Sequence, residues 1–269
     1  TDQPLPAARL SGPGVVAMKP VLKHRWDLTP REAVVLQRKL AARVRPTGRT
    51  PGRAQGRAPA GSYLVAGLDI SGSGRWARRD EKLVAGVIVF RHPERHIVEC
   101  HAIERPSAFP YVPGLLSFRE VPVYAQLLTG LQHEPDLLLC DGQGIAHPRR
   151  FGLAAHLGVL FDTASIGVAK SRLCGEYDAP APARGSRSPL RDGEEIIGTV
   201  LRTRAGVKPL FVSVGHRISL AAAADRVLEL APRYRLPEPT RMADRWVGRL
   251  RRGIDRLPEK PHLGPPPGW

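Results

Sequence analysis

The ten residues from Asp141 to Arg150 combine the side-chain types that a metal-dependent site for nucleic acid requires. They read DGQGIAHPRR and follow Leu137–Cys140, an apolar stretch that predicts a buried strand. A carboxylate binds a hard cation through oxygen, glycine lets a second backbone come close, and arginine contacts phosphate. The segment therefore favours hydrolysis of a nucleic acid backbone near Asp141.

Acids also occur at other positions where elements end or turn, and the full set is Asp69, Glu120, Asp141 and Asp244. Asp69 lies near the end of a strand predicted over 63–70. If that strand neighbours Leu137–Cys140, two carboxylates come within reach of one cation, and two suffice for Mg²⁺. Each acid taken alone has another explanation. An Asp after a strand is commonly a turn former, and Glu120 could complete a capping box with Ser117.

The order of the expected elements predicts an α/β fold with a mixed sheet flanked by helices. A capping box at Thr29–Glu32 opens a helix that runs to about Val44. Further helices are expected over 117–131, 148–157, 219–230 and 239–252. Strands are expected over 63–70, 82–90, 96–104, 137–140, 161–167 and 210–214, and residues 176–194 are expected as a loop. The first three strands form a meander, which makes part of the sheet antiparallel.

The net charge of +16 is concentrated in the two ends of the chain. Residues 1–60 hold 12 Lys or Arg against 3 acids, and residues 245–269 hold 6 against 2. Such basic arms suit a polyanionic partner, although a compositional bias toward arginine would look the same. We expect a flexible N-terminal segment over 1–20, a nuclease domain over 21–252 with a flexible basic linker at 45–60, and a Pro-rich tail over 253–269.

Composition also limits the setting in which the protein acts. The three cysteines are odd in number and contain no CxxC pair, so neither a zinc site nor a disulfide framework is predicted. No apolar run of about 18 residues is present, which argues against a membrane span. A cytoplasmic monomer without a membrane partner is the expectation.

Five sequence blocks resemble the endonuclease V family, the deoxyinosine 3′-endonucleases. Residues 109–120 (FPYVPGLLSFRE) resemble the family's PYIPGFLSFRE, and Asp141–Arg150 resembles DGHGISHPRR. Residues 166–175 (IGVAKSRLCG) resemble IGVAKKRLCG, and residues 215–219 and 234–241 match two further blocks in the same order. The resemblance covers roughly residues 25–250. One departure is Gln143, which replaces the first histidine of DGHG.

The resemblance implies a ribonuclease H-like fold and cleavage of DNA beside deoxyinosine. The family cuts the second phosphodiester on the 3′ side of the lesion and leaves 3′-hydroxyl and 5′-phosphate ends. The implied cofactor is Mg²⁺, with Mn²⁺ as a substitute. By motif match, Asp69 and Asp141 are direct metal ligands and Glu120 is the third acid. Asp244 is implied as a further catalytic residue. His147 and Lys170 are also implied as catalytic residues, and both would lie near the scissile phosphate.

The loop around Tyr111 has its own physical logic. Pro110 and Pro113 fix two φ angles and stiffen the loop, so a tyrosine ring can enter a base stack when the damaged nucleotide turns out. In the family this loop is the strand-separating wedge; without that context, a tyrosine packed on its own prolines would be favoured. The backbone at Gly114, Leu116 and Gly142 is expected to line the pocket for the base. His216 and Arg217, near the start of a helix, are expected to contact phosphate.

Three other functions remain open from the sequence. An endoribonuclease of the same fold would act on inosine in RNA, where the 2′-hydroxyl is available for recognition. A non-catalytic protein would bind inosine or branched DNA without cutting it. A chromatin-like binder would use the basic arms, ignore inosine and lose affinity steeply with salt. The retained core acids argue against the non-catalytic reading.

Overall fold

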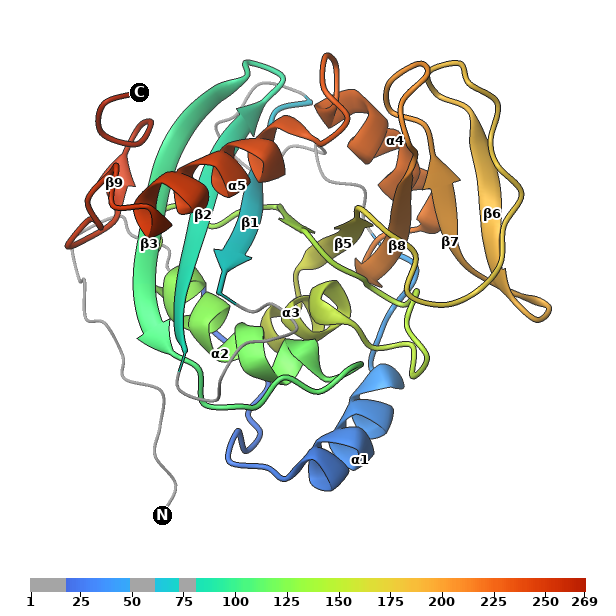
Figure 1. The fold of residues 1–269 in the computed structure, drawn as a ribbon, viewed down its shortest axis with the longest axis horizontal. Coiled ribbons are helices and arrows are strands. Elements are labelled where there is room, and N and C mark those ends of the chain that lie inside the picture. The colour runs from blue at the N-terminus through green and yellow to red at the C-terminus, as the bar shows by residue number, and fades with distance from the viewer. Residues whose placement is uncertain (1–17, 49–60, 73–80) are drawn as a thin grey trace.

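The computed structural model describes residues 18–48, 61–72 and 81–269 (Figure 1). The expected flexibility of residues 1–17 and most of the expected linker, 49–60, fall outside this part of the chain. Within it, five helices flank one nine-stranded sheet. The helices are α1 (Pro30–Ala41), α2 (Leu116–Thr129), α3 (Leu153–Phe161), α4 (Leu220–Leu230) and α5 (Glu238–Arg251). The strands are β1 (Tyr63–Ser71), β2 (Lys82–His92), β3 (His96–Pro106), β4 (Leu137–Cys140), β5 (Ala164–Ala169), β6 (Arg187–Asp192), β7 (Glu195–Leu201), β8 (Leu210–His216) and β9 (His262–Leu263).

The sheet is mixed, with the strand order β6-β7-β8-β5-β4-β1-β2-β3-β9. β4 runs parallel to both β1 and β5, whereas β1–β2, β2–β3 and β5–β8 are antiparallel. The predicted neighbourhood of the first and fourth strands is confirmed, because Leu68 pairs with Cys140. Asp69 and Asp141 are the next residues along these two parallel strands. They therefore lie at one edge of the sheet.

Helices cover both faces of the sheet. On one face, α2 and α3 form a core with β1, β2 and β4, and α1 packs on α3 through Leu40, Phe151 and Ala155. On the other face, α4 packs on β5 and β8, and α5 lies across β1–β3 (Figure 1). Trp246 is the largest side chain buried beneath α5. Burial of these apolar side chains on both faces is the main force that holds the layers together.

The helix α5 approaches the sheet unusually closely at Gly67. A Cβ built on Gly67 would lie 2.1 Å from the Pro239 carbonyl carbon, so only glycine permits this contact. Gly86, the partner of Asp69 in the β1–β2 register, has the same function beneath Val247. The close approach brings the first turns of α5 to the end of β1.

Two stretches differ from the expected secondary structure. The predicted loop over 176–194 contains β6, which forms a hairpin with the unpredicted strand β7. Only Leu190 of β6 is buried, and this polar edge strand therefore lacks the apolar alternation that predicts a strand. The expected helix over 148–157 instead begins at Leu153, because Arg150 adopts a positive φ of 55° in a turn.

The ends of the described chain are attached to the domain. Met18 is buried in the core beneath α2, and β9, from the Pro-rich segment, pairs with β3. The expected basic linker begins at Arg45, whose carbonyl accepts a hydrogen bond from the Arg217 backbone N–H at 2.7 Å. Within the described ranges, no helix is both long and apolar enough to span a membrane.

Candidate metal centre and the adjoining loop

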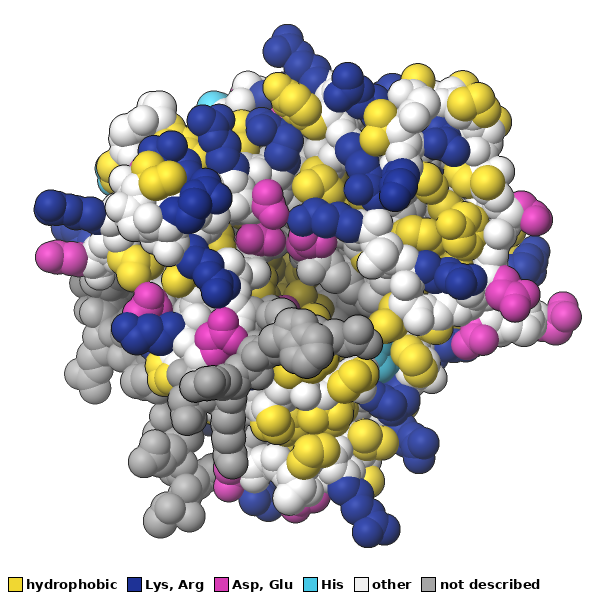
Figure 2. Space-filling view, in the orientation of Figure 1, with side chains coloured by type: hydrophobic (Ala, Val, Ile, Leu, Met, Phe, Trp, Pro, Cys, Tyr) yellow, Lys and Arg dark blue, Asp and Glu magenta, His cyan; other side chains and the backbone are white. Residues whose placement is uncertain are grey.

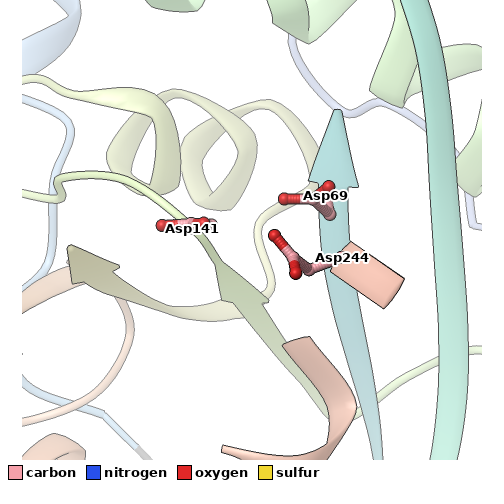
Figure 3. Close-up of side chains that lie close together, drawn as sticks. All are labelled: Asp69, Asp141 and Asp244. Carbon is pink, nitrogen blue, oxygen red and sulfur yellow. The ribbon is translucent and has the colours of Figure 1, made fainter. Parts of the chain in front are cut away.

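Three aspartates from three elements converge at the edge of the sheet. Asp69 lies near the end of β1, Asp141 follows β4 and Asp244 lies on α5 (Figure 3). One carboxylate oxygen from each lies within 4.8 Å of the other two. The three line a pocket together with Lys170. The packing of α5 on Gly67 and Gly86 holds Asp244 near the two strand ends.

The cluster concentrates negative charge in a partly buried place. Burial raises the pKa of Asp69 to about 8, and the neighbouring carboxylates of Asp141 and Asp244 add to this effect. A charged Asp69 is therefore unfavourable unless a positive charge is near. Figure 2 shows a small group of acidic side chains near the middle of this face, with Lys and Arg side chains above it and beside it.

Lys170 supplies part of that positive charge. Its Nζ lies 2.6 Å from Asp141 Oδ2 and 3.2 Å from Asp244 Oδ1. Although partial burial opposes the charged form, the two carboxylates raise the pKa of Lys170. Lys170 directly follows β5, which is parallel to β4, and this order places it beside Asp141.

The donor set fits a hard divalent cation. All three ligand atoms are carboxylate oxygens, which suit Mg²⁺ or Mn²⁺ better than softer metals. One ammonium cannot neutralise three carboxylates, so a divalent ion would remove the remaining repulsion. Glu120 lies outside this group of three, although it also raises the pKa of Asp69. It is buried on α2, and its expected role as third acid stays a prediction.

The proline-rich loop that contains Tyr111 is attached firmly at both ends. Before it, the Phe109 carbonyl accepts hydrogen bonds from Ser107 Oγ and Arg119 Nη1, each at 2.8 Å. After it, the Gly114 carbonyl accepts three hydrogen bonds, and Gly114 has a φ of +79° that favours glycine. Pro110 and Tyr111 are half-buried and Pro113 is exposed. The loop is therefore held by its ends.

The three donors to Gly114 come from two segments. They are His147 Nε2 at 3.0 Å, Arg149 Nη2 at 2.6 Å and Gln37 Nε2 at 3.1 Å. Gln37 Nε2 also donates to the Phe151 carbonyl, and Gln37 Oε1 accepts from Arg149 Nε. We call Gln37, Gly114, His147 and Arg149 the Gly114 anchor. Within it, side-chain hydrogen bonds join α1, the loop and the segment after β4.

Both ring nitrogens of His147 are hydrogen-bonded to protein groups. His147 is buried, its Nδ1 accepts the Arg149 backbone N–H at 3.1 Å, and its Nε2 donates to Gly114. Burial, together with Arg149, lowers the pKa of His147 to about 4, so the ring is neutral at pH 7. The structure thus places His147 under the loop, where it supports Gly114. It does not belong to the cluster of Asp69, Asp141 and Asp244.

Gln37 is a residue that the sequence analysis did not select. It is fully buried, although it lies on α1 between Leu36 and Leu40. A polar residue on the apolar face of an expected helix is the signal that could have identified it, because buried polar groups need hydrogen-bond partners. α1 buries Ala33, Gln37 and Leu40 together.

The glycines after Asp141 contact the protein itself. A Cβ on Gly144 would lie 2.0 Å from the Val214 carbonyl oxygen of β8, so the approaching backbone is the protein's own strand. A Cβ on Gly142 would only contact Leu153. Gln143, the departure from the family motif, donates to the Ser171 carbonyl at 3.1 Å, and its Oε1 is buried with no hydrogen-bond partner among the described residues.

His216 is the last residue of β8, Arg217 lies in the turn before α4, and both are bonded to protein groups. His216 is buried, with Nε2 3.0 Å from Asp162 Oδ1 and Nδ1 accepting the Arg45 backbone N–H. Arg217 Nη1 contacts Asp162 Oδ2 at 3.1 Å. This geometry attaches Arg45, where the basic segment begins, to the domain. Leu116 is the first residue of α2 and is half-buried.

Comparison with known proteins gives one consistent result. Residues 52–245 match the endonuclease V family model. The chain is 46% identical to endonuclease V of Nostoc punctiforme over 230 residues. This alignment covers 85% of this chain and 98% of the Nostoc protein. It is also similar to the crystal structure of endonuclease V from Streptomyces avermitilis, with a TM-score of 0.75, 42% identity and coverage of 85% and 96%.

A third relative was solved with nucleic acid. Ciona intestinalis endonuclease V, in complex with a 24mer DNA containing an inosine followed by a ribo-adenosine, aligns with a TM-score of 0.67 and 29% identity. The alignment covers 84% of this chain and 98% of the Ciona chain. These endonuclease V structures have the ribonuclease H-like fold, and the mixed sheet with helices on both faces agrees with it.

Proposed function

This chain belongs to the endonuclease V family, and we propose that it cuts DNA beside deoxyinosine. The proposed cut is at the second phosphodiester on the 3′ side of the lesion, leaving 3′-hydroxyl and 5′-phosphate ends. The observation that carries the proposal is the convergence of Asp69, Asp141 and Asp244 in one pocket. The firmly held loop around Tyr111 lies beside the same segment and supplies a means of opening the duplex.

The proposed cofactor is Mg²⁺, with Mn²⁺ as a substitute. Asp69, Asp141 and Asp244 would hold the ion through oxygen, and Glu120 would act on it directly or through water. When bound, the ion polarises the scissile phosphate and favours ionisation of an attacking water. Lys170, positioned by Asp141 and Asp244, would donate to an oxygen of the same phosphate.

Recognition of the lesion is assigned to the loop and its surroundings. Tyr111 would fill the gap in the base stack, with Pro110 and Pro113 limiting its movement. Backbone at Gly114, Leu116 and Gly142 would border the hypoxanthine base. His147 would act as a positioning residue through the Gly114 carbonyl.

His216 and Arg217 are proposed to act on DNA less directly. Both are bonded to Asp162, and both hold Arg45, where the basic segment begins. They would therefore present this segment to phosphates, while the Arg217 guanidinium, whose side chain is 43% exposed, can also contact phosphate itself.

Gel-resolved cleavage tests the proposal. The substrates are end-labelled duplexes with one deoxyinosine, the undamaged duplex, and inosine-containing RNA, each incubated with Mg²⁺ or EDTA. We expect a Mg²⁺-dependent nick just past the 3′ neighbour of the lesion. Asp141→Asn should lower the rate by at least about 10³-fold while the dissociation constant for DNA stays within a fewfold, because a metal ligand is lost and the basic contacts are not.

Each other outcome contradicts a specific part. Preferential cutting of RNA would make the protein an endoribonuclease for inosine. Binding of inosine without any cut would make it a non-catalytic reader. Cleavage retained in Asp141→Asn would refute the assignment of the metal centre.

A further inference from the structure

The last helix carries an unusual set of arginines. Including its C-cap Arg252, α5 has five arginines beside or beyond Asp244. Three of them are neutralised by carboxylates. These pairs are Arg241–Glu238 (Nη2 to Oε2, 2.5 Å), Arg249–Asp255 (Nη2 to Oδ1, 2.7 Å) and Arg251–Glu81 (Nη2 to Oε1, 3.4 Å).

The other two, Arg245 and Arg252, differ in both partner and place. Neither forms an ion pair with any carboxylate in the described part of the chain, and both line the pocket that contains the three aspartates. With Gly248, which also lines this pocket, they form one face of α5 at spacings of three and four residues. Two unpaired guanidiniums therefore border the proposed cutting site.

An aromatic ring is attached to this face. The guanidinium carbon of Arg245 lies 4.9 Å from the centre of the Trp269 ring, a cation–π distance. Trp269 remains 38% exposed, so the ring is not buried by this contact. The residue lies beyond 52–245, the segment that matches the family model.

The segment before Trp269 fixes the position of the ring. β9 pairs with β3 through Glu99–Leu263 and Cys100–His262, and the Gly264 N–H donates to the Val98 carbonyl at 2.9 Å. The Trp269 backbone N–H donates to the Pro266 carbonyl at 3.2 Å. The Asp255 carboxylate accepts hydrogen bonds from the side chains of Arg249 and Trp269. Both bonds lower the pKa of Asp255, and the Arg249 bond has the larger effect. The indole is thus oriented from the tail and from α5.

We propose that Arg245, Arg252 and Trp269 form a strand-binding subsite beside the metal centre. The two guanidiniums hold phosphates that flank the cut, and the indole stacks on an unpaired base of the same strand. Arginine is suited to phosphate, and aromatic rings bind bases of any sequence by stacking. The inference rests on the proposed nuclease function, because only a strand seated at the aspartates would pass this face of α5.

The first test measures stacking on a base. The dissociation constant is measured in Ca²⁺ for the wild type, Trp269→Ala and Trp269→Phe, using inosine duplexes in which one nucleotide of the cut strand at a time is abasic. We expect Trp269→Ala to weaken binding by about 5- to 30-fold and Trp269→Phe to restore most of it. At one position of the cut strand, removing the base should weaken binding by the wild type. The same removal should not change binding by Trp269→Ala, because this variant has already lost the stacking contact with that base.

The second test measures phosphate contacts. Arg245→Ala and Arg252→Ala should each lower the slope of log binding constant against log salt by about 1. The matched control is Arg91→Ala, on β2 opposite Leu64 and therefore at the far end of β1 from Asp69. It removes the same charge and should leave the slope unchanged.

The outcomes separate this inference from the proposed function. If the wild type shows no inosine-dependent nick, the proposed function fails first. If the wild type cuts but Trp269→Ala binds like wild type at every abasic position, the stacking subsite is refuted. If Arg245→Ala and Arg252→Ala behave like Arg91→Ala, the phosphate contacts are refuted. Circular dichroism melts identify any variant that has lost its fold.

Discussion

The metal centre and the Gly114 anchor are joined by Asp141–Arg150, yet their polar groups are arranged in opposite ways. In the metal centre, three carboxylates face one another, and burial with like charge raises the pKa of Asp69 to about 8. In the anchor, one carbonyl accepts three hydrogen bonds and a neutral histidine uses both ring nitrogens. The first region needs a cation, whereas the second is satisfied by the protein alone.

This difference matches two different tasks. A metal site must exchange water and substrate, so its ligands keep free coordinating atoms. A recognition loop must be held to a fraction of an ångström by supporting hydrogen bonds. In this protein, repulsion between carboxylates marks the proposed reaction site, and fully satisfied hydrogen bonds mark the groups that hold the loop in place. Substitutions that move the carboxylates of the metal centre or remove the hydrogen bonds of the anchor test this conclusion.

The largest expected effect comes from moving one carboxylate of the metal centre. In Gly67→Ala the added methyl would collide with the Pro239 backbone, so α5 and Asp244 must shift. A displacement of about 1 Å should lower kcat/KM by about 10²-fold. Single-turnover cleavage measures the rate, and circular dichroism confirms that the fold remains. An unchanged rate would mean that Asp244 does not act with Asp69.

The next effect comes from removing the donors of the anchor. Gln37→Met keeps the approximate shape but leaves the Gly114 and Phe151 carbonyls with fewer partners. We expect a loss of about 1–3 kcal/mol of stability and, since a loosened loop also opens undamaged DNA less selectively, about a tenfold lower ratio of kcat/KM for inosine over undamaged duplex.

The matched control for this change is Gln126→Met on α2. Gln126 accepts a hydrogen bond from Arg105 Nε at 2.9 Å on the surface, away from the anchor. It should change stability by less than about 0.5 kcal/mol and leave the ratio unchanged. Equal ratios in Gln37→Met and Gln126→Met would show that the anchor does not position the loop.

A smaller effect is the pH dependence of the metal centre without metal. Because folding raises the pKa of Asp69 from 3.8 to about 8, its contribution to stability is complete below pH 3.8 and is lost as pH rises toward 8. In EDTA, Asp69→Asn should therefore exceed the wild type in melting temperature at pH 8.5 by about 3–6 °C. Mg²⁺ should raise the melting temperature of the wild type most at high pH. It should change the melting temperature of Asp69→Asn little.

The pH dependence of stability that comes from the anchor should have the opposite sign to that of the metal centre. It is also the smallest of the expected effects. Folding lowers the pKa of His147 from 6.5 to about 4, so its contribution is complete above pH 6.5 and is lost as pH falls toward 4. His147→Gln should reduce the stability lost between pH 7 and pH 5 by roughly 1–2 kcal/mol. Denaturant melts at both pH values measure it. Identical losses in both proteins would assign the acid sensitivity to other buried histidines, such as His156 and His216.

Much of the fold could be predicted from local patterns. The capping box opened α1 at Pro30 and Ser219 capped α4, because these signals depend on neighbouring residues alone. The central strand 137–140 was predicted with its observed ends, since it is apolar throughout. The β6–β7 hairpin could not be predicted, because β6 is a polar edge strand without apolar alternation and the hairpin joins the sheet only where β7 pairs with β8.

The amino-acid sequence was enough to identify the residue types of the site and the family, because five blocks keep their order along the chain. It could place Asp69 and Asp141 together, since both follow from adjacent parallel strands. Three contacts could be seen only in the folded chain: Asp244 completes the cluster, Gln37 donates to Gly114, and His147 lies under the loop. These contacts join residues far apart in sequence, and they depend on packing such as that of α5 on Gly67, which no local pattern encodes.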